Sequence, residues 1–299
     1  MPRWLFWTLL TLLSWGLWAV LSKLVGGELS EIHLQAISTV GLVPILASLW
    51  VAKDSSSSGD YRSGILLALG AGVFSSMGNI AYYEAMSQGK AATIVPFTAL
   101  SPVVTIMLAI PLLKERFNRI QFAGICLSLV AILLFNVQPE SDESSGPASR
   151  WLLMALVAVV LWGITGLMQK MSTNHISARS SAIWFLGAFF PVAGGILLYD
   201  QLPSDISTQT WAIAAALGFT LALGNLTILL AFSSGGKASI ITPLAGLYPV
   251  VSIPIAILAF DERLGTRETV AIALALAAVV MLSYQSPADD FSTPRSNRE

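Results

Sequence analysis

GKAATIVPFTALSPVVTIMLAIPLLKER, residues 89–116, recurs as GKASIITPLAGLYPVVSIPIAILAFDER at residues 236–263. The two copies share a Gly-Lys-Ala at the start, two prolines six residues apart and a Glu-Arg at the end, all 147 residues apart. Each copy is an apolar run long enough for a helix that crosses a membrane. The chain therefore contains an internal duplication.

The duplication extends outward from this stretch. Trp15-Gly16 matches Trp162-Gly163 at the same offset of 147, whereas Gly78-Asn79 matches Gly224-Asn225 at 146, so one residue is inserted in the second half. We expect a first half at residues 1–137 and a second half at 151–285. An acidic linker, 138–150, joins them, and a polar tail, 286–299, is expected to be disordered.

The composition predicts that both halves lie in a membrane. Of 299 residues, 55% are hydrophobic and only 11% are charged, and the mean hydropathy is +0.73. A soluble domain carries roughly a quarter of charged residues. The apolar runs are too long for barrel strands, so the sequence predicts an all-α integral membrane protein with ten transmembrane helices near residues 4–25, 32–52, 63–86, 91–113, 118–137, 151–171, 178–199, 209–232, 237–260 and 267–285.

Five helices in each half make the number per half odd, which predicts that the second half enters the membrane the other way up. Two such inverted repeats around a central cavity are typical of secondary transporters. Cytoplasmic termini place 11 of the 16 Lys and Arg residues on the inner side. We therefore expect a multi-pass protein of the cytoplasmic (inner) membrane with both termini cytoplasmic. The run 4–25 is too long for a signal-peptide core and is expected to be a permanent helix.

The repeated Trp-Gly, Gly-Lys-Ala, paired prolines and Glu-Arg resemble the EamA domain, and two linked copies resemble the drug/metabolite transporter superfamily. The resemblance covers about residues 5–137 and 151–285. It implies a ten-helix, basket-like carrier whose relatives export amino acids, metabolites or drugs, or take up sugars or nucleotide sugars. One departure concerns residues 4–25, which contain no carboxylate. The proton exchange of the small multidrug relatives, which needs a glutamate there, is therefore not transferred.

The paired prolines are the first candidate site. Proline lacks an N–H and breaks a helix, so it frees carbonyls that can bind water or a ligand. The alternative is a kink used only for packing. The predicted helix breaks are Pro96, Pro102, Pro243 and Pro249, with Thr98, Ser101, Thr242 and Tyr248 as predicted substrate-binding neighbours.

Polar and aromatic residues inside the other helices complete the predicted binding site. An asparagine in hydrocarbon needs a partner, and a tryptophan in mid-membrane can stack on a substrate. Packing between helices is the alternative for both. The predicted substrate-binding residues in these helices are Trp15, Trp18, Asn79, Tyr82, Tyr83, Trp162, Thr165 and Asn225.

Charged residues near helix ends allow two interpretations each. Glu84 is either a coupling carboxylate or a solvated group at the membrane interface. Lys23 and Lys170 either reach the headgroups or act as gating charges. Glu115 and Glu262 are expected to be structural and to favour the start of the helix that follows each of them.

The predicted function is secondary transport, as an exporter, of small organic metabolites such as amino acids or related solutes. The alternatives are a sugar or nucleotide-sugar uptake facilitator of the same fold and an integral membrane enzyme. We expect no enzyme, because no clustered carboxylates and no Ser/Cys–His pair are visible. No cofactor, metal, nucleic-acid or nucleotide site is predicted. The expected partners are membrane lipid, a small-molecule substrate and protons as a candidate coupling ion, with monomer and homodimer both open.

Overall fold

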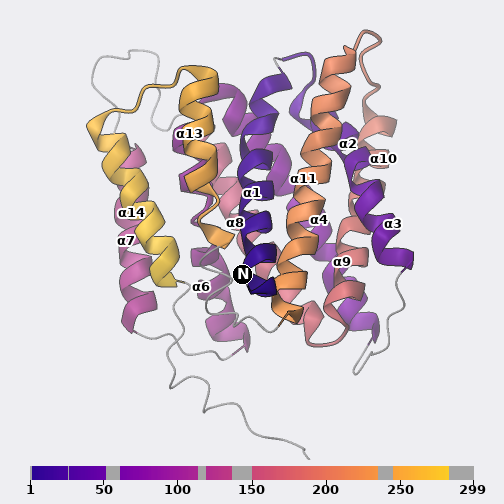
Figure 1. Cartoon of the computed structure of the whole chain (residues 1–299), viewed down its shortest axis with the longest axis horizontal. Helices are drawn as coiled ribbons and strands as arrows, with labels where there is room; N and C mark the ends of the chain where they lie inside the picture. The colour runs from indigo at the N-terminus through magenta and orange to yellow at the C-terminus, as the bar shows by residue number, and fades with distance from the viewer. Residues whose placement is uncertain are drawn as a thin grey trace, which may run out of the picture.

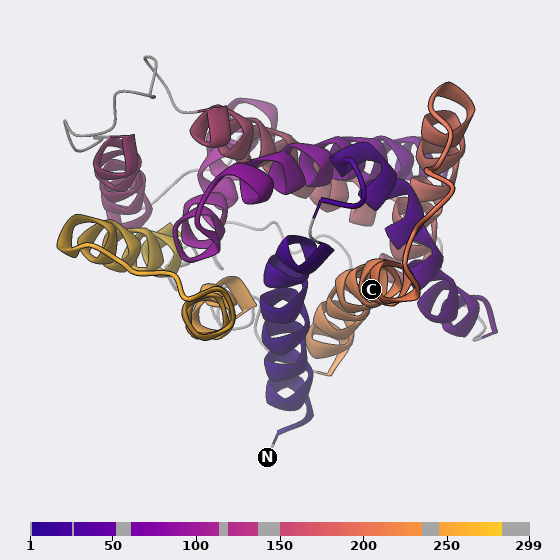
Figure 2. The same ribbon diagram turned by 90° about the horizontal axis from the view of Figure 1, so that it is seen from above.

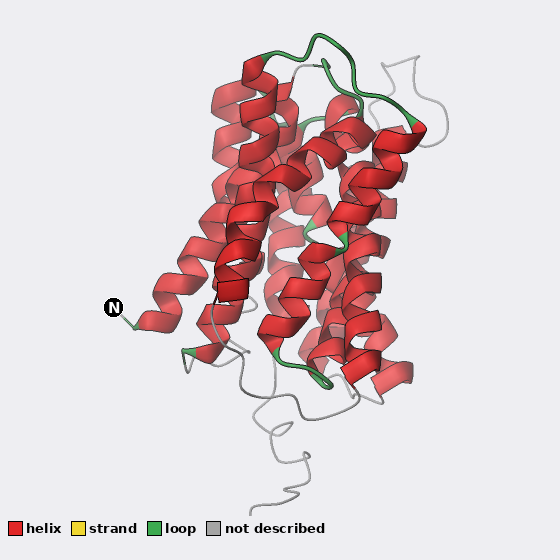
Figure 3. Ribbon diagram, turned by 90° about the vertical axis from the view of Figure 1, so that its right-hand side faces the viewer, coloured by secondary structure: helices red, strands yellow, loops and turns green. Residues whose placement is uncertain are grey.

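The computed structural model describes residues 2–25, 27–51, 61–113, 119–136, 150–234 and 245–282. Every regular element in these ranges is a helix (Figure 3). Six helical segments among them are long and apolar enough to cross a membrane, and four shorter apolar helices accompany them. The all-helical prediction is confirmed for the described ranges, whereas the count of ten transmembrane helices stays a prediction.

The helices of the first half occupy residues 3–136. They are α1 (Arg3–Leu21), η1 (Ser22–Val25), α2 (Glu31–Ser38), η2 (Thr39–Leu42), α3 (Val43–Val51), α4 (Tyr61–Gln88), α5 (Ala91–Thr98), α6 (Ser101–Leu113) and α7 (Arg119–Asn136).

The helices of the second half occupy residues 150–282. They are α8 (Arg150–Thr173), α9 (Ala178–Gly187), α10 (Phe189–Tyr199), α11 (Thr208–Ser233), α13 (Pro249–Phe260) and α14 (Thr266–Leu282). The linker 138–149 and the tail 286–299 lie outside the described residues.

Two helices expected to be continuous are divided. The segment expected at 32–52 comprises α2, the 3₁₀ turn η2 and α3, and the segment expected at 178–199 is split at Ala188 into α9 and α10. A proline follows each division: Pro44 cannot donate to the carbonyl of Val40, and Pro191 cannot donate to that of Gly187. Each still forms one candidate membrane span, Glu31–Leu49 and Arg179–Tyr199, so the expected positions agree and only the continuity of each helix differs.

The predicted break in the repeated stretch is present in the first half. α5 ends at Thr98 and α6 begins at Ser101, because Pro102 has no N–H for the carbonyl of Thr98. In the second half, a turn at residues 247–248 precedes Pro249, the first residue of α13. Turns of this kind lie halfway along the bundle (Figure 3).

Helices of one half pack mainly on helices of the other. α1 contacts α11 and α13, α4 contacts α8, and α7 contacts α14. Figure 1 shows α7 and α14 together at one edge of the bundle, and Figure 2 shows the same arrangement from above. Each first helix of a half thus packs against the third helix of the other half, so the two halves form one interlocked bundle.

Polar contacts show which helix ends lie together. The Lys23 ammonium, at the end of the first span, donates to the carbonyl of Gly89, just after α4, over 2.7 Å. Arg150, the first residue of α8, forms an ion pair of 2.7 Å with Glu84 near the end of α4. The C-terminal ends of α1 and α4 and the N-terminal end of α8 therefore lie at the same end of the bundle.

The loop between η1 and α2 contacts the start of α11 at this end. Gly27 adopts a positive φ of 83°, which glycine tolerates best. The exposed Glu28 carboxylate accepts hydrogen bonds from the Thr210 hydroxyl (2.7 Å) and the Ser207 N–H (3.2 Å). The Thr210 hydroxyl and then Ser207 lower the pKa of Glu28 below its ordinary value of 4.5.

Glu28→Gln should cause a small loss of thermal stability at neutral pH. Because the folded-state pKa is lowered, the stabilisation is present above the ordinary glutamate pKa and disappears as the pH falls through the lowered value. Melting curves of purified protein at pH 7 and pH 4 check this. The acid-induced decrease of the melting temperature should be smaller in the variant, and an equal decrease would contradict the assignment.

Candidate functional site

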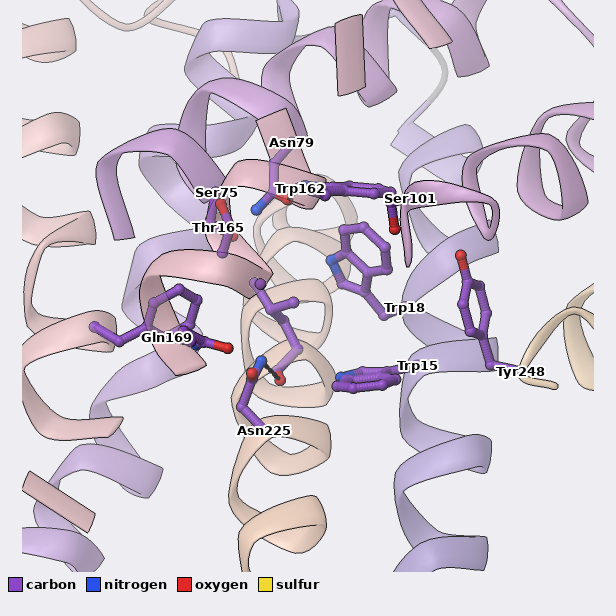
Figure 4. Close-up of a pocket in the computed structure, with 13 residues that line it drawn as sticks. Trp15, Trp18, Ser75, Asn79, Ser101, Trp162, Thr165, Gln169, Asn225 and Tyr248 are labelled. Atoms are coloured by element: carbon purple, nitrogen blue, oxygen red, sulfur yellow. Dashed lines mark hydrogen bonds between the residues drawn. The ribbon is translucent and has the colours of Figure 1, made fainter. Parts of the chain in front are cut away.

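A cavity of about 200 Å³ lies between the two halves. Helices α1, α4, α8, α9 and α11 contribute to it, together with both helix breaks (Figure 4). Its lining residues are Trp15, Trp18, Ser75, Asn79, Ser101, Trp162, Thr165, Gly166, Gln169, Phe185, Leu221, Asn225 and Tyr248.

The two helix breaks occupy equivalent positions at the cavity. Ser101 precedes Pro102 at the start of α6, and Tyr248, 147 residues later, precedes Pro249 at the start of α13. Each break is approached by a glycine of the other half. A Cβ on Gly163 would lie 3.1 Å from the Ser101 carbonyl oxygen, and one on Gly16 would lie 3.1 Å from that of Tyr248. The repeated Trp-Gly pair therefore brings the first helix of each half against the break of the other.

The tryptophan of each Trp-Gly pair also packs across the halves. The Trp162 ring would lie 2.6 Å from a Cβ on Gly78, and the Trp15 ring would overlap one on Gly224. Both rings line the cavity. Gly78 and Gly224 are the glycines of the repeated Gly-Asn pair, so each Gly-Asn accommodates a tryptophan and places its asparagine beside it.

An aromatic cluster lies on one side of the cavity. The Trp18 ring stacks on Tyr82 at 5.1 Å between centroids, and it lies 5.5 Å from Trp162. The Tyr82 hydroxyl donates to the carbonyl of Ala19. Tyr82 and Tyr83 are buried and do not line the cavity. They pack against Trp18 and fix its position, because stacked and tilted aromatic pairs stabilise one another.

The two equivalent asparagines have different partners. The Asn79 side-chain oxygen accepts a hydrogen bond of 3.2 Å from the Trp162 indole N–H, and its NH₂ group is buried without a partner. The Asn225 NH₂ group donates over 2.9 Å to the Leu221 carbonyl of its own helix. The halves are thus similar in sequence but differ in how they present their amides.

Most of the residues predicted to bind substrate come together at this cavity. Eight of the twelve line it: Trp15, Trp18, Asn79, Ser101, Trp162, Thr165, Asn225 and Tyr248. The sequence analysis did not single out Gly166, Phe185 and Leu221. Apolar side chains and a glycine on apolar helices carry no signal that separates cavity lining from packing, so only the tertiary structure could find them.

Four predicted residues are not among the lining. Besides Tyr82 and Tyr83, Thr98 is buried in α5 and its hydroxyl donates to the carbonyls of Ile94 and Val95 over 3.0 and 3.1 Å. Thr242 lies outside the described residues, as does Pro243. Pro96 is buried inside α5, and Pro249 is buried at the start of α13. The binding roles of these residues stay predictions.

Glu262 contacts a different helix from the one expected. Its buried carboxylate accepts the N–H groups of Ala91 and Ala92, both at 2.8 Å, and pairs with the Lys23 ammonium. Glu262 therefore caps α5 of the first half, not the helix α14 that follows it in sequence. The charge suits this position, since a helix N-terminus carries partial positive charge. The expectation that Lys23 extends to the headgroups was incomplete, because its ammonium is held by Glu262 and Gly89.

Glu84 lies near the end of α4, away from the cavity lining. Its carboxylate pairs with Arg150 and accepts a hydrogen bond from Gln88. Both interpretations of Glu84 stay predictions. Among the described residues, no three His, Cys, Asp or Glu side chains gather as a metal site, and the cavity lining supplies amides, hydroxyls and aromatic rings instead.

Comparison with protein families identifies the class. The model of the EamA-like transporter family matches residues 2–137 and 149–284. The chain therefore belongs to the EamA-like transporter family, in two copies of its repeat, and it is a multi-pass membrane protein.

Individual relatives are more distant. An uncharacterized protein of Methanocaldococcus jannaschii is 34% identical over 61 residues, which cover 20% of this chain and 44% of that protein. An uncharacterized transporter of a Sinorhizobium species is 28% identical over 139 residues, 45% of this chain and 96% of the relative. A probable terminal-alkyne amino-acid exporter of Streptantibioticus cattleyicolor is 26% identical over 194 residues, 63% of this chain and 62% of the exporter.

A solved crystal structure shares the fold. It superposes with a TM-score of 0.63 over 92% of this chain and 95% of the other, at 18% sequence identity. This likeness shows that the arrangement of helices is one that occurs in a known protein.

Proposed function

We propose that the protein is a secondary carrier that exports small organic metabolites, with amino acids and related solutes as the first class to test. The observation that carries the proposal is the cavity, which both halves line at equivalent positions through Ser101 and Tyr248. Broken helices around a central cavity are the arrangement by which carriers bind a solute midway through the membrane. Membership of a transporter family supports it, and so does the relative named as an amino-acid exporter.

An inverted repeat of five helices per half is part of the proposal. The end of α1 and the start of α8 lie at the same end of the bundle, as expected when equivalent helices run in opposite directions. A bundle of this kind can open to either side by exchanging the conformations of its halves. We propose the cytoplasmic membrane with both termini cytoplasmic, from the distribution of Lys and Arg.

Counterflow in proteoliposomes tests the transport function. Vesicles loaded with an unlabelled amino acid, sugar or nucleoside should accumulate the labelled solute from outside, and vesicles without protein should not. Trp162→Ala should reduce the initial rate by about tenfold, because it removes both a wall of the cavity and the hydrogen bond to Asn79. Absence of counterflow for every solute of a broad panel would refute the carrier. Accumulation of sugars alone would support the alternative, a sugar facilitator of the same fold.

The same vesicles test the role of Glu84. A proton gradient is imposed, and wild type is compared with Glu84→Gln. We expect the variant to keep its dependence on the gradient, because Glu84 pairs with Arg150 outside the cavity. Normal counterflow together with a lost gradient dependence would assign proton coupling to Glu84.

A further inference from the structure

The cavity has two chemically different walls. Figure 4 shows the rings of Trp15, Trp18, Trp162 and Tyr248 on one side, with the Ser101 hydroxyl among them, and the amides of Asn79, Gln169 and Asn225 on the other, with Ser75 and Thr165 beside them. The aromatic wall comes from α1, from α8 and from the turn before α13. The amide and hydroxyl wall comes from α4, α8 and α11. A solute that fits both walls has a flat apolar body and a polar head.

The aromatic wall is well ordered by its own contacts. Trp18 is stacked on Tyr82 and packed against Trp162, while Tyr248 lies edge-on to Trp15 at 6.4 Å. Ring faces held in this way accept a flat ring by stacking. They also attract cations, so the aromatic wall alone does not decide the charge of the solute.

The rest of the lining determines which charge a bound solute can carry. Among the described lining residues none carries an ionised side chain. Two ion pairs of the described residues, Glu262 with Lys23 and Glu84 with Arg150, lie outside the lining and are already formed. A carboxylate or ammonium that entered the cavity would lose water without gaining an opposite charge, which is costly in a membrane. An uncharged head loses less hydration free energy on entering the cavity, and the amide side chains can replace its hydrogen bonds to water.

Asn79 identifies what the uncharged head must offer. Its oxygen is occupied by the Trp162 N–H, which orients the amide so that the NH₂ group is the free end. That NH₂ group is buried without a partner. A buried donor left unpaired is unfavourable, so the Asn79 NH₂ group is available to an acceptor oxygen. The equivalent Asn225 is not, because its NH₂ group bonds to its own helix.

We infer that the cavity selects small solutes with a flat apolar body and an uncharged head whose oxygen accepts a hydrogen bond from Asn79. This inference rests on the proposed function, because it takes the cavity as the binding site for the solute. It narrows the solute class to carboxamides and similar uncharged groups, in preference to free carboxylates, amines and zwitterions. Within the proposed class of amino acids and related solutes, it therefore favours amides over the free amino acids.

Binding of four solutes with the same ring tests the inference. Phenylacetamide, phenylacetate, phenethylamine and phenylalanine differ in head charge, and isothermal titration of the detergent-purified protein at pH 7 measures each affinity. Phenylacetamide should bind about tenfold tighter than the other three, because only its head leaves no buried charge unpaired. Equal or tighter binding of a charged member would overturn the inference, and so would the absence of binding by all four.

Variants of the two equivalent asparagines locate the donor. Asn79→Leu should weaken phenylacetamide about tenfold by removing the donor, and Asn225→Leu should have the smaller effect of the two. Asn79→Asp replaces the donor by a carboxyl group that can ionise opposite an ammonium, so phenethylamine should bind tighter to this variant than to wild type. A gain of amine binding cannot result from misfolding. Phenylacetamide bound as tightly by Asn79→Leu as by wild type, with an unaltered melting temperature, would overturn the role of Asn79.

The counterflow panel separates this inference from the proposed function. Transport of charged amino acids, with no preference for the amide in binding, overturns the inference and keeps the carrier. Binding of the amide without counterflow of any solute, phenylacetamide included, supports the inference as a binding property and refutes the carrier.

Discussion

Glu262→Ala should destabilise the folded bundle by about 3 kcal/mol, the lower end of the cost of breaking a buried ion pair. The Glu262 side chain is 6% exposed, and it joins α13 to the first turn of α5 and to Lys23. Its removal leaves two helix N–H donors without a partner and the ammonium with only the Gly89 carbonyl. The estimate stays at the lower end because the Lys23 side chain is 24% exposed. Thermal melting of the detergent-purified protein measures the effect.

Two further variants separate the charge from the cap. Glu262→Gln keeps one oxygen for the α5 N–H groups. Its melting temperature should therefore lie between those of wild type and Glu262→Ala. Glu31→Ala is the control, since Glu31 also begins a helix but accepts only an exposed hydrogen bond, from Ser87. It should change stability by less than about 0.5 kcal/mol. If Glu262→Ala melts no lower than Glu31→Ala, the contacts of Glu262 with α5 and Lys23 do not stabilise the folded protein.

Gly218→Ala should destabilise the protein by about 3 kcal/mol or more, because overpacking against a backbone cannot be relieved by a rotamer change. An added Cβ on Gly218 would overlap the carbonyl oxygen of Ser38 and lie 3.1 Å from the Cα of Gly41. A Cβ on Gly41 would in turn overlap the carbonyl oxygen of Ala215. The turn η2 and the helix α11 thus touch through their backbones. Expression level and melting temperature measure the effect.

Replacing a glycine that has open space around it should stabilise the protein instead. Gly194 lies in α10 with no heavy atom within 4 Å of an added Cβ. Gly194→Ala should therefore stabilise by about 0.5–1 kcal/mol, the helix preference of alanine over glycine. If Gly218→Ala and Gly194→Ala have similar effects, the close approach of η2 and α11 is not present in the folded protein.

The sequence predicted the parts of the site that carry a repeated signal. Trp15 and Trp162, and Asn79 and Asn225, stand out because the same residue recurs in both halves, and Ser101 and Tyr248 stand out because each precedes a recurring proline. All six line the cavity. Tyr82 and Tyr83 were predicted to bind substrate as aromatic residues inside the helix expected near 63–86. Position along a helix indicates which face a residue occupies, but not whether the space beside it is open or filled by Trp18.

The sequence by itself determined that this chain is helical, membrane-embedded and duplicated, because apolar run length and the recurrence of motifs are properties of residue order. Only the tertiary structure decided that Glu262 caps α5 of the other half, that helices 32–52 and 178–199 are divided, and that Asn79 is held by Trp162 whereas Asn225 is not. The physical reason is that a hydrogen bond or an ion pair depends on where two side chains meet in space. Lys23 and Glu262 are separated by most of the chain, and the packing of the two halves alone brings them into contact.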